Sequence, residues 1–200
     1  MSRISGALLC GVLLVAATVA DAQNPMRIRG TISSVDGDVL MIKTREGRDI
    51  RVEMDPKVTF SYPKALKLAD LKPGAALGLV AVPGTDGKLV ARGMQVFPAD
   101  RALPNEGHRP FDLEPNSSMT NAAVSGVVEV GKGREVTLTY KGGSQTVVVP
   151  ENTPVVMYVE GDRTLLKPGE YVYIQAGMNN DGKIITSRVQ VSKDGVRPPQ

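Results

Sequence analysis

Apolar and polar residues alternate along most of the chain after residue 25, in short runs rather than at helical spacing. Every second position is apolar in 50–54, and the same holds for 136–140 in the second half. A period of two places successive side chains on opposite faces of a strand, so these runs predict strands with one buried face. The pattern therefore predicts an all-β fold.

Turn-forming pairs separate the predicted strands. Glycine adopts a positive φ at little cost, which suits tight hairpins. Such pairs occur at Asp36-Gly37, Glu46-Gly47, Gly142-Gly143 and Asp181-Gly182. The segment 66–74 (LKLADLKPG) reads as a single helix-like turn, and 164–169 (TLLKPG) repeats it more briefly.

The two halves of the chain are copies of one module. Segment 28–52 aligns with 124–148, and three glycine pairs coincide at an offset of 96 residues: Gly30 with Gly126, Gly37 with Gly133, and Gly47 with Gly143. Further on, LKPG and DGK each recur at an offset of 95 residues. Self-similarity at a fixed period indicates a duplicated structural unit.

Each copy offers five or six short strands, with one loop or helical turn before the fourth. This pattern favours a small barrel resembling the OB-fold over a sandwich. We therefore expect two tandem OB-like β-barrels, at 26–97 and 123–194, joined by a proline-rich, ordered connector at 98–122 and followed by a disordered tail at 195–200. Gly30 and Gly126 mark points where the first strand coils sharply to close each barrel.

The order RGTISSVDGDVLMIKTREGRDIRV, LKPGAALGLVAV, DGKLVARGMQV resembles the short β-barrel domains, often in tandem, of a bacterial family of unknown function. The shared features are turn glycines and strand patterns across both repeats. The resemblance implies an extracytoplasmic β-barrel and brings no catalytic residues with it.

The first 22 residues have the composition of a secretory signal peptide. Arg3 precedes an apolar run over 7–20, and Ala20-Asp21-Ala22 is a small-x-small cleavage signal, so we expect cleavage after Ala22. No later apolar run approaches the about 20 residues of a spanning helix, so no membrane insertion is expected after cleavage. Cys10 is the single cysteine, which leaves the secreted part without disulfides or thiol chemistry. We expect a periplasmic protein.

Composition argues against two classes of function. The net charge of +3 is modest, the chain has no Trp, and the protein is exported, so nucleic acid is not an expected partner. A catalytic triad needs a histidine base, and His108 is the only histidine. It lies in a predicted loop, and no serine lies in a nucleophile elbow. We therefore expect a protein that is not an enzyme.

A metal site is the main alternative. Imidazole and thioether ligands suit Cu(I), and His108 and Met119 lie eleven residues apart in one polar segment. These two residues are the candidate ligands for periplasmic copper. The simpler interpretation is an exposed linker histidine and a methionine that packs on a barrel.

The connector at 98–122, which contains His108 and Met119, also suggests an interaction site. It contains four prolines, which stiffen it, and two apolar residues, Phe111 and Leu113, that favour docking on a surface. We therefore expect a non-enzymatic periplasmic binding or accessory protein that recognises an envelope protein or a small ligand. Copper binding is the second hypothesis, and an enzyme of unknown type is the third.

Overall fold

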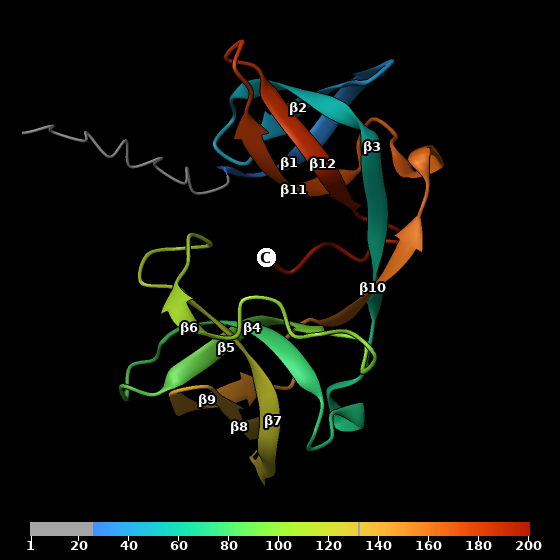
Figure 1. The fold of residues 1–200 in the computed structure, drawn as a ribbon. Helices are drawn as coiled ribbons and strands as arrows, with labels where there is room; N and C mark the ends of the chain where they lie inside the picture. The colour runs from blue at the N-terminus through green and yellow to red at the C-terminus, as the bar shows by residue number, and fades with distance from the viewer. Residues whose placement is uncertain (1–25, 132) are drawn as a thin grey trace, which may run out of the picture.

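A computed structural model describes residues 26–131 and 133–200, and the backbone of these residues is built of strands and short turns (Figure 1). Twelve strands belong to one continuous hydrogen-bonded sheet. Two short 3-10 turns interrupt them, η1 (Leu68–Asp70) and η2 (Arg163–Leu165). The predicted all-β fold is confirmed. The expected signal peptide, 1–22, lies outside the described residues.

Five strands from the two ends of the chain form a closed barrel, which we call the terminal barrel. These strands are β1 (Met26–Asp36), β2 (Val39–Thr44), β3 (Asp49–Ala65), β11 (Tyr171–Met178) and β12 (Ile184–Val191). They follow the order β12-β11-β1-β2-β3, and a parallel pairing of β12 with β3 closes the circuit. The interior is apolar, with Ile32, Leu40 and Ile42 almost completely buried.

Five strands from the middle of the chain form a second, curved group of paired strands, which we call the central sheet. They are β4 (Ala76–Pro83), β5 (Leu89–Val96), β7 (Ser118–Val130), β8 (Gly133–Tyr140) and β9 (Gly143–Pro150). Their order is β5-β4-β7-β8-β9, and its two ends meet through a short parallel pairing at Leu89↔Val147 and Val90↔Val148. A second apolar core fills this set, with Leu77, Leu79 and Leu138 fully buried.

Each sequence repeat contributes strands to both cores. Strands β1 and β3 of the first repeat pair with β11 and β12 of the second, whereas β4 pairs with β7 and β5 pairs with β9. The two cores therefore do not coincide with the expected units 26–97 and 123–194. The strand faces of the repeats are equivalent, so exchanged strands fill each core with the same kind of side chain.

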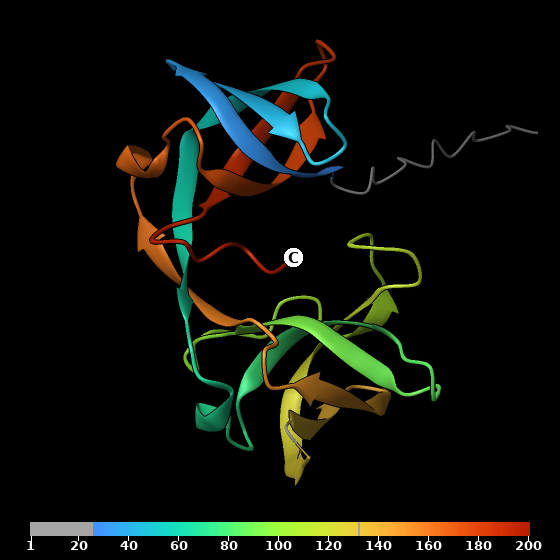
Figure 2. The same cartoon turned by 180° about the vertical axis from the view of Figure 1, so that it is seen from behind.

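The length of β3 accounts for this exchange. β3 extends for 17 residues, from the terminal barrel to the edge of the central sheet, so β4 begins too far away to fold back beside β1. β10 (Val155–Gly161) returns the chain along the same path. It pairs antiparallel with the far part of β3, from Phe60 to Ala65, and parallel with β5. Figures 1 and 2 show both strands passing between the two bodies.

Two segments outside these strands are also packed. β6 (Gly107–Pro110), within 98–122, pairs with β7. Residues 195–200, for which the sequence predicts disorder, run between the terminal barrel and the central sheet, and Pro198 is buried (Figures 1 and 2). Among the described residues, no helix has the length and apolar character needed to cross a bilayer.

Candidate functional site

A cavity of about 210 Å³ lies where the terminal barrel faces the central sheet. Three arginines line it: Arg27 from β1, Arg188 from β12, and Arg109 from β6. Most of the remaining lining is aromatic or amide in character, with Pro104 and Met119 as the exceptions, and the described lining residues include no Asp or Glu. We call this space the arginine cavity.

The outer face of the terminal barrel positions Arg27 and its neighbours. Arg27 and Arg29 flank the core residue Ile28, so their side chains leave β1 on the face opposite the core. In the β1–β11 register, Arg27 lies opposite Gln175 and Arg29 opposite Tyr173, which places all four side chains on one surface. Such a surface is normally solvated, but Arg29 is only 4% exposed here.

An aromatic ring from the 111–117 loop covers these arginines. The guanidinium carbons of Arg27 and Arg29 lie 4.9 Å and 5.4 Å from the centroid of Phe111, and that of Arg29 also lies 5.1 Å from the centroid of Tyr173. A cation over an aromatic face is attracted by the negative face of the ring, and more strongly when water is excluded. Phe111, predicted as an interaction residue, therefore forms part of the cavity wall.

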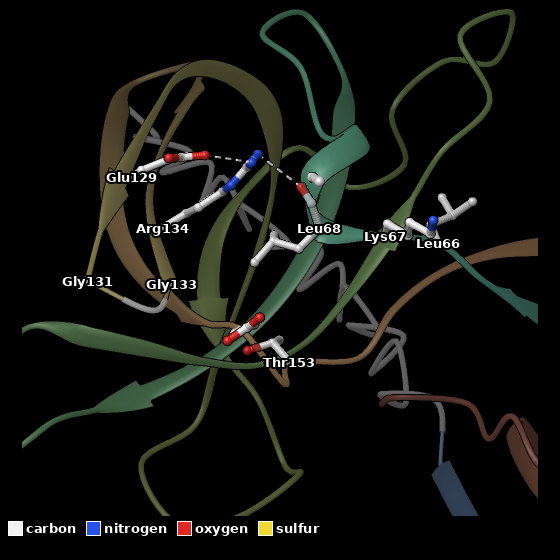
Figure 3. Close-up of a pocket in the computed structure, with 10 residues that line it drawn as sticks. Leu66, Lys67, Leu68, Glu129, Gly131, Gly133, Arg134 and Thr153 are labelled. Carbon is white, nitrogen blue, oxygen red and sulfur yellow. Dashed lines mark hydrogen bonds and ion pairs between the residues drawn. The ribbon is translucent and has the colours of Figure 1, made fainter.

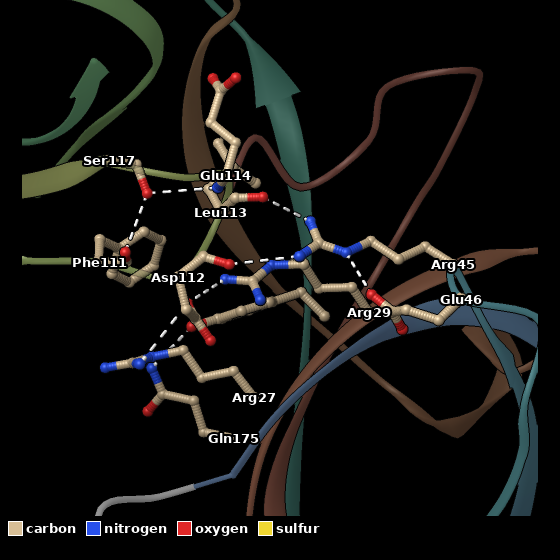
Figure 4. Close-up of polar contacts among 11 residues, drawn as sticks. Arg27, Arg29, Arg45, Glu46, Phe111, Asp112, Leu113, Glu114, Ser117 and Gln175 are labelled. Carbon is tan, nitrogen blue, oxygen red and sulfur yellow. Dashed lines mark hydrogen bonds and ion pairs between the residues drawn. The ribbon is translucent and has the colours of Figure 1, made fainter. Parts of the chain in front are cut away.

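Polar contacts hold this loop against the terminal barrel (Figure 4). Arg29 donates to Asp112 Oδ1 at 2.9 Å, and Arg27 lies 3.5 Å from the same oxygen. Arg45 donates to the carbonyl oxygens of Leu113 and Asp112 at 2.7 Å and 3.2 Å. Leu113, the second predicted interaction residue, thus contacts the barrel through its backbone carbonyl.

Positive charge exceeds negative charge around the cavity. Asp112 is the single acidic partner of Arg27 and Arg29, and within 26–131 and 133–200 neither Arg109 nor Arg188 forms an ion pair. The one hydrogen bond that the Arg109 side chain makes to a described residue is donated to the carbonyl oxygen of Asn105, at 2.9 Å. Partial burial lowers the pKa of Arg109, and the like charge of Arg27 lowers it further. Both effects indicate a site whose electrostatics favour an added anion.

Buried polar atoms without a partner are also concentrated here. Over the described part of the chain, four such side-chain atoms occur: Arg27 Nε, Arg29 Nε, Tyr158 Oη and Gln190 Oε1. Arg27 and Gln190 line the cavity, Arg29 packs behind Phe111, and Tyr158 lies in an adjoining hollow that shares Gln190. Burial raises the pKa of the Tyr158 phenol well above its ordinary range. Unsatisfied buried groups are uncommon in folded proteins, and their clustering marks this region as a site.

The structure does not bring the two predicted metal ligands together. In the β6–β7 register, His108 lies opposite Thr120, and Arg109 lies opposite Met119. Opposed residues share a face and neighbours along a strand alternate, so His108 and Met119 project to opposite sides. His108 Nδ1 forms a hydrogen bond of 2.8 Å with Thr120 Oγ1, whereas Met119 is 5% exposed and lines the arginine cavity. One ion therefore cannot be held by both side chains in this arrangement.

A larger hollow of about 610 Å³ lies at the far end of the central sheet, between η1 and the β7–β8 turn (Figure 3). The arginine that lines it, Arg134, already has hydrogen-bond partners. It donates to the carbonyl oxygen of Leu68 and to the Glu129 carboxylate, at 3.1 Å each. Two acidic residues, Glu129 and Glu151, line the same hollow. Its charges compensate one another, so the arginine cavity is the stronger candidate.

Sequence reasoning missed Arg27, Arg109 and Arg188. Arginines at alternate positions of a half-buried strand are normally assigned to the solvated face, and nothing in the local pattern distinguishes Arg27 and Arg29 from such residues. The available signal was the apolar Phe111 two residues after Arg109. In comparisons with known proteins, the chain matches no family model, no curated protein and no solved structure.

Proposed function

We propose that this protein is a non-enzymatic binding protein that holds an anionic group of its ligand in the arginine cavity. The carboxylate or phosphate of the ligand lies between Arg27 and Arg109, with Arg188 at the rim. We also infer that the protein is periplasmic and is cleaved after Ala22, as the leader sequence predicts. The proposal narrows the expected ligand to an anion.

The observation that carries the proposal is a cavity whose described lining contains three arginines and no carboxylate. A guanidinium presents parallel N–H donors that match a carboxylate or phosphate in a bidentate contact. Charge-assisted hydrogen bonds gain strength where water is excluded. Arg109 is partly buried and has no carboxylate partner among the described residues, and an anionic ligand would offset the cost of that partial burial.

The proposed architecture gives this site two walls. We infer that the terminal barrel and the central sheet are OB-like units. Segment 98–122 leaves β5 and returns to β7, both in the central sheet, so it does not join the two units along the chain; we infer that it is an ordered loop that contacts both. Two contacts support this role. The ion pair of Arg92 with Glu114, at 2.6 Å, holds it to the central sheet, and the Asp112–Arg29 contact holds it to the terminal barrel. An anion in the cavity would contact residues from both units.

Isothermal titration of the purified protein with inorganic phosphate and with succinate tests this function. A hydrogen bond to a charged group contributes about 1.5–3 kcal/mol, so Arg109→Gln is expected to weaken binding by about 10- to 100-fold. Arg51→Gln is the matched control, because it removes the same charge from an exposed ion pair with Glu53 outside the cavity. Equal affinities for Arg109→Gln and Arg51→Gln would contradict the proposed site.

A further inference from the structure

The segment from Lys193 to Gln200 crosses between the two bodies and reaches the arginine cavity (Figures 1 and 2). Its first part is held by the terminal barrel. Lys193 Nζ lies 4.1 Å from the ring centroid of Tyr62, and the guanidinium carbon of Arg197 lies 5.3 Å from that of Tyr171. Pro198 is buried. The segment is therefore held at Lys193, Arg197 and Pro198, whereas Asp194 and Gly195 are exposed.

Its last two residues lie on β5 of the central sheet. A Cβ built on Gly93 would lie 2.7 Å from Pro199 Cβ and 2.9 Å from the Pro199 carbonyl oxygen, so only glycine admits the proline there. Gln200 donates its side-chain amide to Gln95 Oε1 at 2.7 Å, and Gln200 also lines the arginine cavity. Gly93 and Gln95 are two residues apart in one strand and thus share its cleft-facing side.

We infer that this cleft is a receptor for the carboxyl end of an extended, proline-containing peptide. The inference rests on the proposed function and names its ligand. Gly93 accepts a proline, Gln95 pairs with the side chain that follows, and Arg27 and Arg109 take the carboxylate. Pro199 and Gln200 occupy the Gly93–Gln95 track in cis, and Gln200 also lines the cavity.

The chemistry of the docked segment supports this ligand class. Proline-containing segments are stiff and extended before binding, so they lose little conformational entropy when they dock against aromatic side chains. Phe97 lines the cavity, and Tyr62 and Tyr171 contact the cationic side chains of Lys193 and Arg197 in the docked segment. Arginines at the end of the track supply the donors that a terminal carboxylate requires.

A tethered segment competes with any peptide in solution. Its effective concentration is in the millimolar range for a short flexible linker, so the unaltered protein should bind an added peptide weakly. Displacing the segment should expose the track and strengthen binding. Stronger peptide binding after displacement of the segment therefore distinguishes a peptide site from a site for a small free anion.

The test uses the full chain with Pro198→Asp and Pro199→Asp, which displaces the segment, and a fluorescein-labelled peptide of residues 194–200 (DGVRPPQ) with a free carboxylate. Fluorescence anisotropy should show binding at least about ten-fold tighter than to the unaltered protein. Adding Gly93→Ala should weaken peptide binding by about ten-fold or more, because the new Cβ occupies the position of the proline. Gly177→Ala is the control, since a Cβ at Gly177 meets nothing within 4 Å.

An amidated peptide separates the carboxylate from the rest of the ligand, and it should bind about ten-fold more weakly. If the double aspartate variant does not fold, judged by circular dichroism, the milder Pro199→Gly with Gln200→Ala replaces it. Absence of peptide binding, or equal binding of the amidated peptide or of the Gly93→Ala protein, overturns the inference. Phosphate titration of the same proteins reports on the proposed function separately: phosphate binding that depends on Arg109, without peptide binding, leaves that function intact and removes only the peptide.

Discussion

Asp112 is the residue on which the arginines of β1 converge. Arg29 is almost fully buried, and its guanidinium donates to Asp112 at 2.9 Å. Partial burial raises the pKa of Asp112, but the hydrogen bond from Arg29 and the charges of Arg29 and Arg27 outweigh this effect and hold the pKa below its ordinary value of 3.8. The contact joins the 111–117 loop to the terminal barrel and so holds one wall of the cavity in place.

Replacing Asp112 with Asn should lower the free energy of unfolding by about 1–2 kcal/mol at pH 7, because a charged acceptor is lost but the half-exposed position is partly screened. A depressed carboxyl pKa contributes stability that is present above pH 3.8 and lost as pH falls through the lower folded value. The unaltered protein and the variant should therefore converge below that pH. Urea unfolding at pH 7 and at pH 3 measures the difference, and a gap unchanged at pH 3 would speak against the ion pair.

At the scale of the element, the two first-strand glycines of the repeat are not equivalent. A Cβ on Gly30 would lie 2.3 Å from the Lys43 carbonyl oxygen and 2.8 Å from the Thr44 Cα, both backbone atoms of β2. A Cβ on Gly126 would meet only the Thr137 side chain, at 3.7 Å. β1 thus needs glycine for close approach to β2, whereas β7 does not need it for its approach to β8.

Gly30→Ala should therefore destabilise the protein by about 2–3 kcal/mol, as overpacking against an unyielding backbone does. Gly126→Ala should stay within about 0.5 kcal/mol of the unaltered protein. The midpoints and slopes of urea unfolding compare the two variants directly. Equal losses in both would mean that the glycines serve the same role in both repeats.

At the scale of the whole molecule, strand exchange makes each half of the sequence incomplete. Residues 26–100 contain β1–β3 and lack β11 and β12, whereas 101–200 contain β7–β9 and lack β4 and β5. Each half would leave both cores open and unpaired strand edges exposed.

Fragments 26–100 and 101–200 should consequently be unfolded when produced separately and should form a one-to-one complex when produced together. Circular dichroism and analytical ultracentrifugation measure folding and stoichiometry. Two independently folded fragments would show that each repeat closes a barrel from its own strands.

Much of the fold could be predicted from local pattern because strands and turns are local properties. The glycine pairs mark the hairpins correctly, as at Gly37 between β1 and β2 and at Gly142 between β8 and β9. The structure places Phe111 against Arg27 and Arg29, and its role as an interaction residue stays a prediction. Which strands pair with each other was not predictable. The two repeats have similar apolar faces, so a strand could pair within its own repeat or with the other repeat.

The sequence by itself determined that the chain is all-β, that glycine and turn motifs recur in its two halves, and where its strands turn, because alternation and glycine conformation act over a few residues. Tertiary structure decided that the repeats exchange strands, that His108 and Met119 face apart, and that arginines far apart in sequence line one cavity. The physical reason is that pairing and register are non-local. Arg27 and Arg109 are 82 positions apart; the pairing of β6 with β7 and the docking of the 111–117 loop on the terminal barrel place them in the same cavity.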